Sequence, residues 1–145
     1  MAVKSTPEGY NTVTPLLSVK GAAQLIDFLK KAFEAVEVYR FPGPEGTVRH
    51  AEMKIGDSVI MLGEACDKSA PMPTALYLYV QDADAVYQKA LQAGGEKIMA
   101  PEDMFWGDRV STVKDFAGNM WWIATHVEEV SSEELERRAE KSMAA

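Results

Sequence analysis

One order of elements occurs twice in this sequence at a constant spacing. An offset of 61 residues relates Val19 to Val80, where the first strand of each half is expected to end, and Met61 to Trp122 in the last strand of each half. Each half-module leaves a sheet face that its twin can complete, so a repeat of this length favours one architecture built from two similar units.

The first half, about residues 11–65, predicts a strand, a helix and then three strands. Residues 12–19 are rich in strand formers, and residues 22–33 carry apolar side chains at helical spacing. Three strands follow, over residues 36–41, 48–55 and 58–62. The tight turn Gly56-Asp57 joins the last two as a hairpin.

The second half, about residues 74–127, predicts the same order. A strand over residues 75–80 precedes a helix that Asp82 can cap and that Gly94-Gly95 can end. Three further strands are expected at residues 97–99, 109–114 and 119–125, with a turn at Ala117-Gly118 before the last.

The expected fold class is therefore α+β, with two βαβββ modules. A charged helix over about residues 131–143 follows them, because Ser131 and Glu134 have the spacing of a capping box. We expect residues 1–145 to form a single domain, since this length suits one core.

Charge and cysteine content exclude several classes of protein. A net charge of −7 disfavours nucleic acid and anionic lipid as partners, and no apolar run is long enough to cross a membrane. The N-terminus lacks the apolar core of a secretory signal, and Cys66 is the only cysteine. We therefore expect a cytoplasmic protein without disulfides.

Two βαβββ units with a Gly-Asn turn before the last strand resemble the vicinal oxygen chelate superfamily, which includes glyoxalases and bleomycin resistance proteins. The resemblance covers roughly residues 10–128. The stretches RHAEMKIGDSVIMLGEA, MFWGDRVSTVKDFAGNMWW and IATHVEEVS are further similar to its PhnB-like branch. This resemblance implies a mixed sheet that curls around a ligand cavity, and a homodimer.

The resemblance also implies four positions for metal ligands, on the first and last strands of each module. In this chain they are occupied by Thr14, Met61, Ala75 and Trp122. None of these side chains is a normal ligand for a hard or borderline divalent ion. We therefore expect no metal and no other cofactor.

Strand alternation predicts which other side chains face the cavity. His50 and Glu52 should share the face of Met61, because pairing Ile55 with Ser58 across the turn sets Glu52 opposite Met61. The residues predicted to bind a ligand are Thr14, Leu16, Met61, Ala75, Tyr77, Tyr79, Trp106, Arg109 and Trp122.

This lining suits a small, partly aromatic organic molecule, since aromatic faces stack and methionine adapts its shape. Alternatively, the large side chains fill a collapsed interior. His50 and Glu52 could transfer protons, or His50 could be structural. Arg109 could receive a ligand carboxylate, or make a surface or dimer contact.

Three functions follow from these alternatives. The first is metal-independent binding of a small organic molecule, as in resistance proteins that sequester drugs. The second is a glyoxalase-like lyase or isomerase that uses His50 and Glu52 as acid and base. The third is a structural or partner-binding dimer whose cavity is closed.

Overall fold

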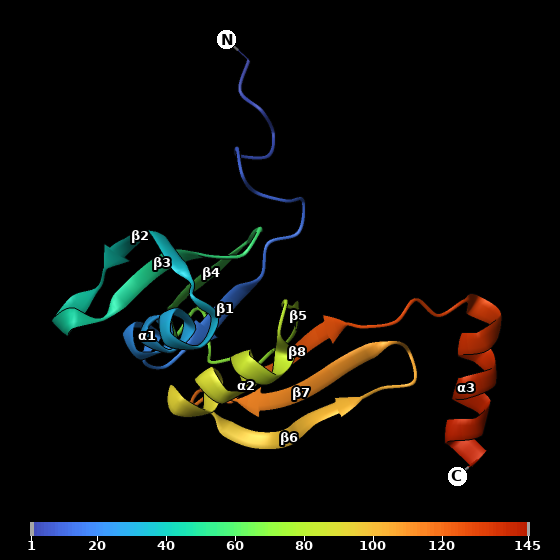
Figure 1. The fold of residues 1–145 in the computed structure, drawn as a ribbon. Helices are drawn as coiled ribbons and strands as arrows, with labels where there is room; N and C mark the ends of the chain where they lie inside the picture. The colour runs from blue at the N-terminus through green and yellow to red at the C-terminus, as the bar shows by residue number, and fades with distance from the viewer. Residues whose placement is uncertain (1, 145) are drawn as a thin grey trace.

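The computed structural model describes residues 2–144, and the predicted α+β fold of two βαβββ modules is confirmed (Figure 1). The first module contains β1 (Leu16–Val19), α1 (Ala22–Phe33), β2 (Val36–Pro42), the short 3-10 helix η1 (Pro44–Gly46), β3 (Val48–Ile55) and β4 (Ser58–Glu64). The second contains β5 (Ala75–Tyr79), α2 (Ala83–Gln92), β6 (Glu96–Asp103), β7 (Asp108–Lys114) and β8 (Met120–His126). The C-terminal helix α3 spans Ser132–Ala144.

Each module forms one mixed four-stranded sheet. The strand orders are β1-β4-β3-β2 and β5-β8-β7-β6, with the first pair of each order parallel and the others antiparallel. Leu16 lies opposite Met61 in the first sheet, and Tyr77 lies opposite Trp122 in the second. The offset of 61 residues therefore holds for both partners of this strand pair.

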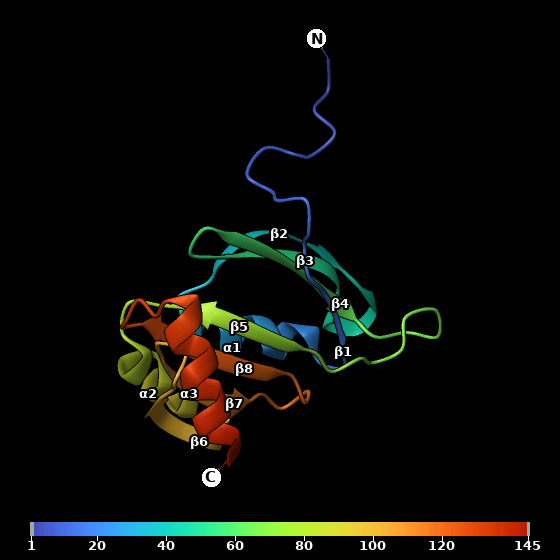
Figure 2. The same ribbon diagram turned by 90° about the vertical axis from the view of Figure 1, so that its right-hand side faces the viewer.

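Helices α1 and α2 lie between the two sheets, as Figures 1 and 2 show. One core runs through this layer, because Phe33 of α1 contacts Trp121 of β8 with ring centroids 5.0 Å apart. The side chains that meet the helices are buried, for example Leu17 with 2 % of its surface exposed. Burial of these apolar faces against one helical layer is the main driving force for the arrangement.

The opposite face of each sheet points away from the helices, and the two sheets are not closed around one cavity within the chain. We call these surfaces the first outward face (β1–β4) and the second outward face (β5–β8). Leu16 alternates with Leu17 and is 67 % exposed on the first. Met61 and Trp122 therefore belong to separate faces, whereas the sequence predicted one shared cavity.

Different caps start the two helices of the core. The carboxylate of Glu64 accepts hydrogen bonds from the backbone N–H groups of Gly21 and Ala22, at 2.8 and 3.1 Å, and so satisfies the N-terminus of α1. Asp82 caps α2 as predicted, since its side chain accepts from the N–H of Ala85 at 3.1 Å.

The connections of the two hairpins differ in length by three residues. In the first, Ile55 pairs with Ser58 across a two-residue turn, as predicted. In the second, Lys114 pairs with Met120, and residues 115–119 form a five-residue loop that contains the predicted turn at Ala117-Gly118, where the Gly118 N–H donates to the Asp115 carbonyl at 3.0 Å. The odd difference in length shifts the register of β7 by one residue and exchanges its two faces relative to β3.

The side chain of Asp115 fixes this five-residue loop from inside. One oxygen accepts from the N–H groups of Ala117 and Asn119, and the other accepts from Asn119 Nδ2 and from Trp121 Nε1 at 2.8 Å. Asp115 and Asn119 are both buried. These buried hydrogen bonds therefore fix the conformation of the loop against the core.

The bounds of two strands differ from the sequence-based prediction. β1 begins at Leu16, so Thr14 precedes the strand, and β6 extends to Asp103. Helix α3 lies to one side of the second sheet in Figure 1. Arg138 holds it there by donating to the Phe105 carbonyl at 3.0 Å and to the Glu128 carboxylate at 2.8 Å. Within residues 2–144, no helix is long and apolar enough to span a membrane.

Candidate functional site

A buried carboxylate organises the first outward face. Glu52 accepts hydrogen bonds from the hydroxyl groups of Tyr10 and Tyr39, and its other neighbour is His50, whose Nε2 lies 2.9 Å from Glu52 Oε2. We call these four residues the Glu52 cluster. The structure thus brings together His50 and Glu52, the two residues that the sequence assigned to acid and base chemistry.

The hydrogen bonds of this cluster keep Glu52 ionised. Burial raises the pKa of Glu52, but hydrogen bonds from Tyr10, Tyr39 and His50 outweigh burial and hold the pKa below its usual range. The hydrogen bond between Tyr10 and Glu52 in turn raises the pKa of Tyr10 to about 12. Glu52 is therefore a weak base, and its carboxylate orients the His50 imidazole.

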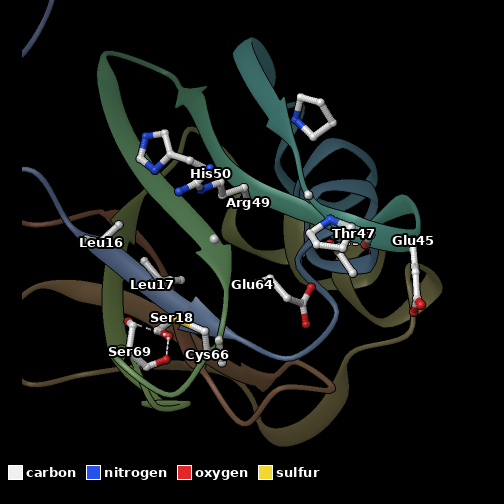
Figure 3. A pocket seen from close by; sticks show the side chains of 15 residues that line it. Leu16, Leu17, Ser18, Glu45, Thr47, Arg49, His50, Glu64, Cys66 and Ser69 are labelled. Carbon is white, nitrogen blue, oxygen red and sulfur yellow. Dashed lines mark hydrogen bonds between the residues drawn. The ribbon is translucent and has the colours of Figure 1, made fainter.

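A cavity of about 850 Å³ opens beside His50 on the first module. Figure 3 shows that its lining comes from β1, β3, β4 and the two loops that contain Glu45 and Ser69. Ser18 joins the floor to one loop, since its hydroxyl donates to the Ser69 carbonyl at 2.9 Å. Of the predicted site residues, Leu16 and His50 line this cavity.

A second buried carboxylate organises the second outward face. Asp108, with 2 % of its surface exposed, accepts hydrogen bonds from the Tyr77 and Tyr79 hydroxyl groups at 2.7 and 2.9 Å. Trp106 Nε1 donates to the same oxygen at 3.1 Å, and His126 Nδ1 lies 2.8 Å from the other oxygen. We call these five residues the Asp108 cluster.

These contacts shift the acid–base properties of the cluster. Burial raises the pKa of Asp108, but the hydrogen bonds from Tyr77, His126 and Tyr79 lower it by more. The pKa of Asp108 is therefore below its usual range. Burial and the bond to Asp108 raise the pKa of Tyr77 to about 12. The bond to Asp108 also raises the pKa of His126, which favours the charged imidazole.

Four aromatic rings lie together on this face, and we call them the aromatic platform. Its members are Tyr77, Tyr79, Trp106 and Trp122. Tyr77 stacks on Trp122 with centroids 6.2 Å apart and planes inclined by 17°, and it contacts Tyr79 at 5.3 Å. Four of the predicted ligand-binding residues are thus on one surface, on neighbouring strands and the loop before β7.

The structure does not bring Arg109 to this surface. The register shift of β7 turns Arg109 to the helix side, where its guanidinium contacts Asp84 at 2.8 Å and Asp103 at 3.2 Å. Its neighbour Asp108 takes the outward position instead. Thr14 lies before β1 and donates to the Asn11 carbonyl at 3.4 Å, and Ala75 begins β5.

The four positions at which the resemblance implies metal ligands do not form a donor set. Met61 and Trp122 occupy the outward positions in the last strands, with a thioether and an indole. Within residues 2–144, no three His, Cys, Asp or Glu side chains are placed to hold a metal ion. The residues present therefore do not fit a catalytic divalent ion of the usual kind.

A sequence profile of the Glyoxalase/Bleomycin resistance protein/Dioxygenase superfamily matches residues 10–123. The chain belongs to this superfamily. An uncharacterized protein of Mycobacterium bovis is 38 % identical to the present chain over 147 residues, which cover 94 % of each chain.

Solved structures share the same fold. TioX from Micromonospora sp. ML1 has a TM-score of 0.67 and 22 % identity, over 79 % of this superfamily member and 99 % of TioX. The PhnB protein from Bacillus cereus has a TM-score of 0.64 and 19 % identity over 79 % and 99 %. The fosfomycin resistance protein FosX from Mesorhizobium loti has a TM-score of 0.60 and 17 % identity over 88 % and 97 %.

Sequence reasoning missed four members of the two clusters, namely Tyr10, Tyr39, Asp108 and His126. Tyr10 precedes the first strand, and no local pattern ties it to Glu52. Asp108 and His126 lie opposite each other on β7 and β8. The length of the 115–119 loop sets this register, and a sequence analysis that assumed five residues in the loop would have placed both side chains on the outward face.

Proposed function

We propose that this protein binds a small, partly aromatic organic molecule without a metal ion, at a site that a second copy of the chain completes. One observation carries the proposal. Apart from Thr14 and Arg109, the predicted ligand-binding side chains lie on two outward faces of one chain, and each face forms one wall of a site without the opposite wall.

Exposed apolar surface supports the pairing of two copies. Leu16 and Phe41 on the first outward face are 67 % and 56 % exposed, and Tyr79 on the second is 65 % exposed. Large exposed apolar side chains grouped on one surface are typical of binding or association sites. If the first face of one copy covers the second face of the other, a twofold dimer gains two equivalent sites.

The oligomeric state tests the second copy. Light scattering at micromolar concentration should give the mass of a dimer, and Leu16→Lys should give a monomer because it places a charge in the covered surface. Val3→Lys is the matched control, since Val3 is an exposed apolar residue in the segment that precedes β1. A wild-type monomer would contradict this part of the proposal.

Ligand binding is tested by a thermal-shift screen of partly aromatic metabolites and natural products in the presence of a chelator. We expect a hit to raise the melting temperature of the wild type and to have no effect on Leu16→Lys. A hit whose effect disappears on chelation would contradict metal independence. Failure of every compound, together with a tightly packed Trp122, would favour the structural dimer with a closed cavity.

A glyoxalase-like lyase or isomerase is the second candidate. The contact of 2.9 Å between His50 Nε2 and Glu52 favours it, because a buried carboxylate can orient an imidazole for proton transfer. Turnover of a bound compound that survives chelation and is lost in His50→Ala would support this activity. Binding without turnover would leave the first function alone.

We also propose that the chain belongs to the PhnB-like branch of the superfamily. The stretch MFWGDRVSTVKDFAGNMWW supports this assignment, as does the fold shared with the Bacillus cereus PhnB protein. A phylogenetic tree that groups this chain with other branches would contradict it.

A further inference from the structure

Three polar hydrogens of the aromatic platform are used within the protein. Tyr77 Oη, Tyr79 Oη and Trp106 Nε1 each carry one such hydrogen, and all three donate to Asp108 Oδ2. The platform therefore has no hydroxyl or indole hydrogen to offer a ligand through these groups. Besides the indole N–H of Trp122, the platform presents ring faces and phenol lone pairs, and both are rich in electrons.

The rings are also held in fixed directions. Two phenol oxygens share one carboxylate oxygen, so Tyr77 and Tyr79 cannot turn independently, although Tyr79 is 65 % exposed. Their planes are inclined by 58°, and the Trp122 ring stacks on Tyr77 with its plane inclined by 17°. Inclined rings let one cation contact more than one π face.

The charged groups around the platform also favour a positively charged ligand. The imidazole of His126 lies between two acids, at 2.8 Å from Asp108 and 3.2 Å from Glu129. Arg138, whose guanidinium donates to the Phe105 carbonyl beside Trp106, is paired with Glu128 and Glu134, and Glu134 also pairs with Arg137. These arginine pairs are balanced, whereas two acids, Asp108 and Glu129, face the one His126, and with the net charge of −7 this gives a negative potential at the platform.

We infer that the aromatic platform binds a cationic aromatic group, meaning a ring that carries a quaternary or permanently protonated nitrogen. This inference rests on the proposed function and assigns the charge of its ligand. A cation gains attraction to the ring faces and to the buried Asp108 carboxylate. An anion of the same shape meets repulsion from both, and a neutral ring gains stacking alone.

Calorimetric titration of the wild-type protein with three probes of similar shape tests the inference. The probes are N-methylquinolinium, quinoline at pH 8, where it is neutral, and quinoline-2-carboxylate. We expect the cation to bind about tenfold more tightly than quinoline, and the carboxylate to bind least. Tyr79→Leu should abolish the difference between cation and neutral probe.

Phe116→Leu is the matched control, because Phe116 is an exposed aromatic residue on the 115–119 loop and not on the platform. It should keep the preference for the cation. Quinoline or its carboxylate binding as tightly as the cation would overturn the inference and leave the proposed function standing. Failure of all three probes to bind would overturn both, and a preference that survives Tyr79→Leu would overturn the location.

Discussion

Trp121 and Trp122 are neighbours on β8, but they serve opposite faces of the sheet. The Trp121 indole is fully buried, packs on Phe33 and donates to Asp115. The Trp122 ring is partly exposed and stacks on Tyr77. The two tryptophans therefore provide a matched pair for separating the core from the outward face.

Replacing each tryptophan by alanine should give very different stability losses. Trp121→Ala leaves a cavity in the core and should cost about 3 to 5 kcal/mol of unfolding free energy. Trp122→Ala loses one ring contact and part of a burial, and should cost about 1 to 2 kcal/mol. Urea unfolding of both variants measures the difference. Equal losses would mean that Trp122 is packed in a closed interior.

Asp115→Ala should destabilise the protein strongly, because Asn119 and Trp121 would keep buried donors without an acceptor. A buried unsatisfied group costs about 1 to 3 kcal/mol, and here two are created. The control is Asp57→Ala in the other hairpin, an exposed turn residue whose loss should stay within about 0.5 kcal/mol. Chemical denaturation of the two variants gives the comparison, and similar losses would refute the role of Asp115.

Stability should depend on pH through His126. The pKa of His126 is raised by its hydrogen bond to Asp108, so the charged imidazole stabilises the fold. This contribution is fully present below the unfolded pKa of about 6.5 and is lost as pH rises through the raised folded pKa. The stability difference between wild type and His126→Gln should therefore be larger at pH 6 than at pH 9. The opposite order in urea unfolding would show that the neutral form is preferred.

Added zinc or nickel should not change the melting temperature of the protein at equimolar concentration. The reason is the lack of a donor set at Thr14, Met61, Ala75 and Trp122. Elemental analysis of purified protein is the second measurement. Stoichiometric metal that is lost in a variant of His50 or His126 would reveal ligands outside these four positions.

Much of the fold could be predicted from the sequence, because apolar spacing and turn residues mark the elements locally. The pairing of Glu52 with Met61 followed from the two-residue turn at Gly56-Asp57. Arg109 could not be placed in the same way. Its face depends on whether the later turn holds two or five residues, and buried hydrogen bonds of Asp115 decide this.

The candidate site was harder to predict than the fold. Alternation places His50 beside Glu52, but it says nothing of Tyr10, which reaches Glu52 from outside the sheet. It also cannot say how the two sheets face each other. The helices between them decide this, and their position results from contacts such as Phe33 with Trp121 that no local pattern encodes.

The five-residue loop at 115–119 has a consequence for how such a protein can diversify. One codon gained or lost there moves every side chain of β7 from one side of the sheet to the other, while β8 stays fixed by its parallel pairing with β5. A duplicated gene can thus acquire two chemically different ligand walls in a single mutational event, without any substitution in the residues of β7 themselves.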